Sequence, residues 1–186
     1  MGSAALKYPG DTGFDQTSFN LARWDEILRD QFLATLEYRI ETDRFGQIVM
    51  STPPGPSHGG KQFEIGNQLD ELMGKGKGKV LTECPISTSD GVKGCDTVWI
   101  SRTRLKPMRE LSCFTTAPEI CVEVVSPSNS KAEIDHKVEL YFEAGAKEVW
   151  VCAESGEMAF YVGKTGETLA QSRLCPEFPS VIDPWA

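Results

Sequence analysis

The acid that stands out most in the sequence is Glu123, because it interrupts the apolar run ICVEVV at residues 120–125. Burial of a carboxylate is costly unless a cation or a hydrogen-bond donor compensates it. Alternate residues of a strand share a face, so Glu123 would point with Cys121 and Val125. Glu123 is therefore a candidate functional acid, and an ion-paired carboxylate at a strand end is the alternative that the pattern leaves open.

A lysine is equally out of place in the segment that follows. Ile134, Val138 and Tyr141 form an apolar stripe at helical spacing, and Lys137 lies three residues after the first and four before the last. Lys137 therefore borders the core-facing side of a predicted helix. This spacing fits a functional ammonium group, and it equally fits a lysine that snorkels to the edge of the helix.

A second acid, Asp96, begins the predicted strand DTVWIS, one strand before Glu123. Two carboxylates can hold Mg²⁺ through oxygen ligands and leave coordination positions for water and a phosphate. The ion would activate or orient an attacking water, and the Lys137 ammonium would orient that water or stabilise developing charge. The three residues suit phosphodiester hydrolysis, with Mg²⁺ as the expected cofactor and Mn²⁺ as a substitute.

The cysteines and histidines argue against zinc. The six cysteines have no pair at two-residue spacing, and the chain has two histidines, so clustered zinc ligands are not expected. Cys121 and Cys152 lie in apolar, strand-like runs, where a thiol behaves as a small hydrophobe. We expect reduced, structural thiols at positions 84, 95, 113, 121, 152 and 175.

Periodicity and turn residues predict the elements that would position this set. Helices are expected at 18–30 behind a Thr17 or Ser18 cap, at 58–73 behind a Ser57 cap, and at 131–144 before a stop at Gly145. A β-hairpin is expected at 36–51. Further strands are expected at 80–88, 96–101, 119–125 and 148–153, with GVKG at 91–94 separating the first two.

This order predicts an α/β fold in which helices flank a mixed central sheet, preceded by an N-terminal helix and a hairpin. The length fits a single domain over residues 1–186, with 1–16 as a candidate flexible tail. Apolar stretches are too short for a membrane span, and residues 1–30 lack the pattern of a secretory signal. We therefore expect a cytoplasmic protein.

The charge distribution bears on nucleic-acid binding. A net charge of −8 argues against nonspecific wrapping of nucleic acid, whose phosphates attract lysine and arginine. Basic residues are nevertheless concentrated in two segments, and they either track phosphates or are solvated loop charges. The first segment contains Lys75, Lys77 and Lys79, and the second contains Lys93, Arg102, Arg104, Lys106 and Arg109.

Four segments carry a family resemblance: YRIETDRFGQIVMSTPPGPSHGG, CDTVWIS, APEICVEVVSPSNS and DHKVELYFEAGAKEVWV, in this order over about residues 36–152. They resemble the Uma-two family of inferred restriction endonucleases, within the PD-(D/E)XK nuclease superfamily. The resemblance implies a restriction-endonuclease-like fold and metal-dependent cleavage of DNA. Because cleavage of both DNA strands is often done by paired sites, a homodimer is also a candidate assembly.

Matched position by position, the resemblance assigns Asp96 and Glu123 to the acids of the two half-motifs, and both would bind the metal. Val125 stands where the superfamily usually has a lysine, so Lys137 on the following helix would replace it. Glu41 in the hairpin matches a recurring family glutamate that would complete the acidic cluster. The alternative is a catalytically weak nucleic-acid-binding or dimeric scaffold protein of the same fold.

Other polar motifs carry less chemistry. His58, near a predicted helix start, suits contact with a phosphate or a role as a base, and a structural role is the alternative. His136 points about a hundred degrees away from Lys137 around the helix, so we expect it on the surface. Ser126 lacks the GxSxG surroundings of a nucleophile and is expected to cap. GKGKGK at 74–79 lacks the spacing of a phosphate-binding loop.

Overall fold

The computed structural model describes residues 7–74, 76–163 and 166–185; residues 1–6 of the expected tail and Lys75 lie outside this description. The helices are α1 (Gln16–Arg29), α2 (Pro56–Leu72), α3 (Arg102–Leu105) and α4 (Lys131–Glu143), with a 3-10 turn at Leu33–Thr35. The strands are β1 (Arg39–Thr42), β2 (Ile48–Ser51), β3 (Gly78–Thr88), β4 (Gly91–Ser101), β5 (Ile120–Val124), β6 (Glu148–Cys152), β7 (Met158–Val162) and β8 (Glu167–Leu169). Within the described ranges, no helix is both long and apolar enough to cross a membrane.

Six strands form the central sheet in the order β3-β4-β5-β6-β7-β8, and β1 pairs with β2 in a separate antiparallel hairpin. β5 and β6 run parallel, with α4 in the connection between them, whereas the other neighbours pair antiparallel. The mixed sheet, its flanking helices, the N-terminal helix and the hairpin confirm the predicted α/β architecture. β7 and β8 extend it beyond the expected strands.

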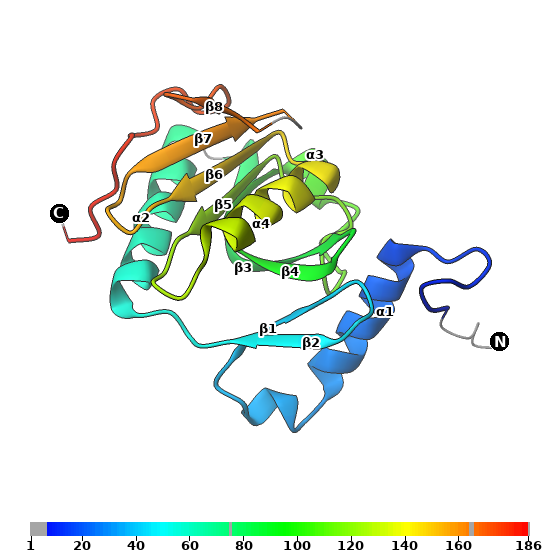
Figure 1. The fold of residues 1–186 in the computed structure, drawn as a ribbon. Coiled ribbons are helices and arrows are strands. Elements are labelled where there is room, and N and C mark those ends of the chain that lie inside the picture. The colour runs from blue at the N-terminus through cyan, green and yellow to red at the C-terminus, as the bar shows by residue number, and fades with distance from the viewer. Residues whose placement is uncertain (1–6, 75, 164–165, 186) are drawn as a thin grey trace.

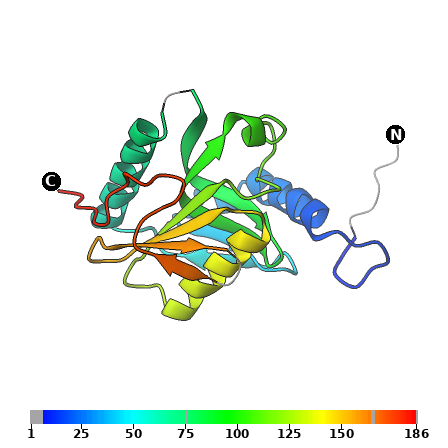
Figure 2. The same ribbon diagram turned by 90° about the horizontal axis from the view of Figure 1, so that it is seen from above.

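Helices α2 and α4 lie on opposite faces of the central sheet, as Figure 2 shows from above. On the α4 face, Ile134, Val138 and Tyr141 belong to one apolar cluster with residues of β3, β4, β5 and β6. On the α2 face, Ile65 and Leu69 belong to a second cluster with strand residues and the C-terminal segment. β5 is buried on both faces, which explains why its sequence is a continuous apolar run.

The hairpin crosses beneath α4 and lies beside α1 (Figure 1). Its attachment to the sheet is direct, because the Gly94 N–H on β4 donates to Glu41 Oε1 on β1 at 2.9 Å. From the other side, Arg23 Nε on α1 donates to the Gly46 carbonyl in the hairpin turn at 2.9 Å. These contacts fix β1 against β4, so the side chains of β1 that face the sheet are available to a site there.

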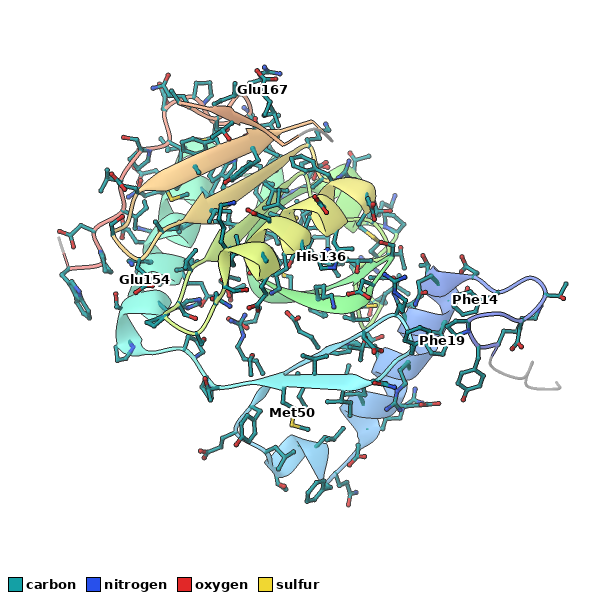
Figure 3. All side chains as sticks on the ribbon, in the orientation of Figure 1. Phe14, Phe19, Met50, His136, Glu154 and Glu167 are labelled. Carbon is teal, nitrogen blue, oxygen red and sulfur yellow. The ribbon has the colours of Figure 1, made fainter. Side chains whose placement is uncertain are left out.

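The start of α1 differs from the expectation. Its cap is Asp15, whose carboxylate accepts a hydrogen bond from the Ser18 N–H at 2.8 Å, whereas Thr17 and Ser18 lie inside the helix. The prediction was wrong because an aspartate in an extended conformation one turn earlier already satisfies the free N–H. Phe14 and Phe19 pack there with ring centroids 5.7 Å apart (Figure 3).

Two further boundaries also differ. α2 begins after Gly55 with Pro56 in its first turn, so Ser57 is a helical residue and not the cap. Proline suits this position because its missing N–H has no partner in the first turn anyway. The segment GVKG at 91–94 does not separate two strands but starts β4. The tight β3–β4 turn lies directly before Gly91, which itself adopts a positive φ of +85°.

β3 and β4 depart from regular strand geometry at one shared position, where Glu83 lies opposite Asp96 and their register is interrupted. Cys95 and Val98 both belong to the α4-face cluster, although residues an odd number apart on a regular strand face opposite sides. The alternation therefore breaks near Asp96, which lies between them. At the corresponding position of β3, Glu83 adopts a φ of +52°, a left-handed conformation that is strained for this residue type.

The cysteines behave as expected from their surroundings. All six are free and buried. Burial raises the pKa of Cys84 to about 12 and that of Cys152 to about 11, so both thiols are neutral at pH 7. They pack as small hydrophobes in the two clusters.

Candidate functional site

The structure brings the four predicted residues together. Glu41 on β1, Asp96 on β4, Glu123 on β5 and Lys137 on α4 line one cavity of about 60 Å³, together with Arg39. The acids reach it because β4 and β5 pair from Thr97↔Val122 onward, which places Asp96 and Glu123 one position beyond the last paired residues. The cavity lies between the sheet, α4 and the hairpin.

Asp96 is almost completely buried, and three groups bond its carboxylate. Arg39 Nη2 approaches Oδ1 at 2.7 Å, the Val124 N–H donates to Oδ2 at 2.7 Å, and His58 Nε2 lies 3.3 Å from Oδ2. Burial acts to raise the pKa of Asp96, but the hydrogen bond from His58 and the charge of Arg39 outweigh it. The pKa therefore lies below its ordinary value, and Asp96 is an anion at neutral pH.

Glu123 has a different environment. The Tyr141 hydroxyl donates to Oε1 at 2.6 Å, and Lys137 Nζ donates to Oε2 at 3.2 Å. Burial raises the pKa of Glu123 to about 7, against the opposing charge of Lys137 and with a further upward contribution from Asp96. Asp96 therefore stays ionised at neutral pH, whereas Glu123 titrates near neutrality. The pair carries one negative charge below about pH 7 and a second one above it.

Lys137 connects the helix, the sheet and the hairpin. Its ammonium group lies 2.8 Å from Glu41 Oε1, 3.2 Å from Glu123 Oε2 and 3.1 Å from the Gly94 carbonyl oxygen. Burial acts to lower the pKa of Lys137, but the charges of Glu123 and Glu41 prevail and raise it. The side chain does not snorkel into solvent, since it is 12% exposed and each of its three N–H groups has an acceptor within reach.

Arg39, Glu83 and Gln62 also contact Asp96 or its partners, although no sequence motif marks them as site residues. Arg39 Nη2 bridges Asp96 and Glu83 Oε2, which lies 2.8 Å away. Gln62 Nε2 donates to Glu83 Oε1 at 2.8 Å and to the Asp96 carbonyl oxygen at 2.5 Å. One signal was available for Arg39: it lies two residues before Glu41, so both side chains share a face of β1.

The two histidines differ sharply. His58, in the first turn of α2, is buried against Asp96, and its Nδ1 atom is without a hydrogen-bond partner among the described residues. In the next turn of α2, Lys61 fixes the start of the helix by donating to the carbonyl oxygens of Ala153 and Glu154 after β6. His136 is half-exposed and contacts Asp90 at 3.4 Å, outside the cavity.

The turn before α4 and the basic segments correct two further expectations. Ser130, not Ser126, caps α4; Ser126 instead donates to Asn129 Oδ1 at 2.8 Å within the preceding turn. Two of the basic residues are not loop charges. Lys93 is buried and donates to the Thr42 carbonyl oxygen, and Arg104 donates to backbone carbonyl oxygens and pairs with Glu119. The exposed members are Lys77, Lys79, Arg102, Lys106 and Arg109.

The fit of the cavity to a divalent ion depends on the donor set. Within the described part of the chain, no group of three or more histidine, cysteine, aspartate or glutamate side chains is arranged to hold a metal. Asp96 and Glu123 provide oxygen donors, and a two-carboxylate set suits Mg²⁺, which usually keeps several waters and takes further oxygens from a substrate phosphate. The residues present therefore fit such an ion as two carboxylate ligands, and the remaining coordination positions would be left to water and substrate.

The raised pKa of Glu123 predicts a pH effect on the metal-free protein. The folded state retains the Glu123 proton up to about pH 7, whereas the unfolded chain releases it near its ordinary value of 4.5. Stability from this group is thus lost as pH rises between these values. Glu123→Gln lacks the effect, so between about pH 5 and about pH 8 its free energy of unfolding should gain roughly 1–3 kcal/mol relative to the wild type. Denaturant unfolding in EDTA at several pH values measures the free energy of unfolding of both proteins. The same change with pH in the wild type and in Glu123→Gln would contradict the prediction.

The fold and the site together define an α/β protein of the restriction-endonuclease type. The chain belongs to the Uma2 family, whose description is "Putative restriction endonuclease" and whose model matches residues 24–179. One similar solved structure is described as "a putative nuclease belonging to DUF820 from Anabaena variabilis ATCC 29413"; its TM-score is 0.65 at 19% identity, over 78% of this chain and 82% of that one. That likeness concerns the fold, and no curated protein matches the chain.

Proposed function

We propose that the chain is a metal-dependent DNA endonuclease that hydrolyses phosphodiester bonds. The observation that carries this proposal is the position of Lys137, whose ammonium lies within 3.2 Å of Glu123 and 2.8 Å of Glu41, with Asp96 lining the same cavity. Several carboxylates and a lysine around one small cavity match the needs of phosphodiester hydrolysis, in which a nucleophilic water and a charged phosphate must be held together.

In this proposal Asp96 and Glu123 would hold a Mg²⁺ or Mn²⁺ ion, which when bound supplies an acidified water and neutralises phosphate charge. Asp96 is suited to this role because its carboxylate is already ionised at neutral pH. Glu123 would give up its proton, and the Tyr141 hydroxyl at 2.6 Å would keep its carboxylate oriented. Lys137 would exchange one of its present acceptors for the attacking water or the phosphate.

Metal use gives a direct test. Oxygen ligands should favour Mg²⁺ and Mn²⁺ over Zn²⁺. Plasmid DNA should be nicked or linearised with either of the first two ions, weakly or not at all with Zn²⁺, and not at all after complete chelation with EDTA. Isothermal titration of each ion gives an independent measurement of binding. Cleavage that persists after chelation would overturn the proposed chemistry.

DNA as the partner predicts a salt dependence. The exposed residues Lys77, Lys79 and Arg102 lie at one end of β3 and β4, where the Arg102 N–H donates to the Lys77 carbonyl at 3.1 Å. Two more exposed basic residues, Lys106 and Arg109, follow α3 in the chain. If four of these exposed residues contact phosphates, duplex affinity should fall about 100-fold between about 50 and about 200 mM salt. Lys77→Ser should reduce the slope by about one, whereas the control Arg173→Ser should leave it unchanged. A flat salt response measured by fluorescence anisotropy would count against DNA as the partner.

The second candidate is a catalytically weak nucleic-acid-binding or homodimeric scaffold, and one observation favours it. Both acids already have protein cations beside them, because Arg39 contacts Asp96 and Lys137 contacts Glu123. Each of these two acids therefore has a protein counter-ion without an added metal. Absence of metal binding at millimolar concentration, with a normal thermal melt, would support the scaffold. Metal binding accompanied by cleavage would support the endonuclease, in which a homodimer would supply one site for each strand.

A further inference from the structure

Arg39 is shared by two carboxylates, one inside the candidate site and one outside it. Its Nη2 atom lies 2.7 Å from Asp96 Oδ1 and 2.8 Å from Glu83 Oε2, so a single nitrogen contacts both acids. The described residues that line the candidate cavity include Arg39 and Asp96 but not Glu83. Asp96 is almost completely buried, whereas the Glu83 side chain is 50% exposed. The guanidinium group therefore connects a buried acid of the site with a carboxylate that reaches solvent.

The two carboxylate oxygens of Asp96 differ in how firmly the protein occupies them. Oδ2 accepts the Val124 N–H at 2.7 Å and lies 3.3 Å from Nε2 of the buried His58 ring. In the described part of the chain, the hydrogen bond to Oδ1 comes from Arg39 alone. Because Arg39 has a second carboxylate within reach, Oδ1 is the oxygen that the protein can release to another cation.

The Glu83 carboxylate is oriented toward Arg39. Gln62 Nε2, on α2, donates to Glu83 Oε1 at 2.8 Å, which leaves Oε2 for the guanidinium group. Glu83 has a φ of +52°, a conformation that glycine or asparagine adopts at lower cost than glutamate. Backbone strain of this kind persists only where the surrounding structure maintains it. What glutamate adds at this strained position is a carboxylate beside Arg39.

We propose that Arg39 exchanges its ion-pair partner: it neutralises Asp96 while no ion is bound and pairs with Glu83 alone when Asp96 binds a divalent ion. This inference rests on the proposed function, because it concerns the ion proposed there. Two cations on one carboxylate oxygen repel each other, so Arg39 has to leave Oδ1 before that oxygen can act as a ligand. Glu83 is then a positioning residue, which changes metal affinity through Arg39 and is not itself a ligand.

The exchange explains how Asp96 can have a protein counter-ion and still bind metal. A partly buried guanidinium group that left Asp96 without finding another anion would be an uncompensated charge, which is strongly unfavourable. Glu83 Oε2 is already 2.8 Å from the same nitrogen, so Arg39 keeps an ion pair in both states. Glu83 therefore reduces the free-energy cost of metal binding at Asp96.

A double-mutant cycle on Mg²⁺ affinity tests the exchange, by isothermal titration at about 150 mM salt, which screens distant charges. Glu83→Gln should weaken Mg²⁺ binding roughly 10-fold, as for other partners outside the ligand set of a metal. Arg39→Met should strengthen it roughly 10-fold, because an arginine beside a carboxylate opposes the binding of other cations. Added to Arg39→Met, Glu83→Gln should change the affinity by less than about 2-fold, since no guanidinium group is left to exchange.

Glu26→Gln is the matched control. Glu26 pairs with Arg23 at 2.9 Å, and its side chain is 54% exposed against 50% for Glu83. The described lining of the candidate cavity includes neither Glu26 nor Arg23, so this variant should bind Mg²⁺ as the wild type does.

Glu83→Gly guards against a loss of folding in Glu83→Gln. Glycine adopts the positive φ without strain, and this relief offsets the loss of a half-exposed ion pair, so the thermal melt should be retained. The variant has no carboxylate at this position and should bind Mg²⁺ as weakly as Glu83→Gln.

The outcomes separate this inference from the proposed function. No binding of Mg²⁺ or Mn²⁺ by the wild type at millimolar concentration would overturn both. Wild-type affinity in either Glu83→Gln or Glu83→Gly would overturn the exchange and leave the nuclease in place. An equal loss for Glu83→Gln with and without Arg39→Met would also refute the exchange, because Glu83 would then act on the ion directly.

Discussion

Replacing Asp96 by asparagine is expected to abolish cleavage and to reduce Mg²⁺ affinity by at least about 100-fold, since even outer-shell partners of metal sites contribute 10- to 100-fold. The amide keeps the size of the side chain and can still accept the Val124 N–H, but it removes the charge. Arg39 retains Glu83 as an ion-pair partner at 2.8 Å. The fold should therefore persist, with a loss of roughly 1–3 kcal/mol in the free energy of unfolding.

Glu148→Gln is the matched control for this experiment. Glu148 is as deeply buried as Asp96, and its carboxylate accepts hydrogen bonds from Trp150 Nε1, Ser172 Oγ and two backbone N–H groups. It pairs with Ile120, three residues before Glu123, so it lies about 10 Å along the strands from the site. Its amide variant should lose stability but keep metal binding and cleavage. If both variants lose activity in proportion to the decrease in their melting temperatures, Asp96 acts through stability alone.

Lys137→Met is expected to lower the cleavage rate by roughly 10²- to 10³-fold, as for removal of a group that stabilises charge in the transition state. The methionine keeps the unbranched stem beside Ile134 and Tyr141. The spacing of the sequence alone would suggest an unchanged or slightly stabilised fold, but the contacts predict otherwise. The ammonium bonds Glu41 and Glu123, so its loss should cost about 1–3 kcal/mol. The cost should be smaller at acidic pH, where Glu123 takes up a proton.

Lys131→Met controls for the loss of one positive charge on the same helix. Lys131 is exposed and pairs with Asp135 one turn along α4, so its replacement should leave the melt and the cleavage rate unchanged. The thermal melt and the cleavage rate have to come from the same sample. An intact melt with wild-type cleavage for Lys137→Met would remove the ammonium from the proposed chemistry. If Lys137→Met shows no cooperative thermal melt, both measurements are repeated at about pH 5.5, where the variant should fold because Glu123 is protonated.

The sequence by itself determined much of the secondary structure around the candidate site, because local patterns are set by local chemistry. The apolar stripe of Ile134, Val138 and Tyr141 specified the core-facing side of α4, and Gly145 ended the helix with a positive φ of 105°. The apolar run around Glu123 specified a strand buried on both faces. A carboxylate in that run and a lysine beside that stripe are anomalies visible from residue type and spacing, so they could be selected without coordinates.

Only the tertiary structure decided which groups surround these anomalies. His58 and Arg39 come from α2 and β1, and they meet at Asp96, where the alternation of faces along β4 breaks between Cys95 and Val98. Lys93 and Arg104 look like loop charges in the sequence, yet backbone carbonyl oxygens from distant segments take up both cations. Long-range contacts of this kind leave no periodic trace, since the partner of a buried charge is chosen by how the strands and helices pack and not by the residues next to it in the chain.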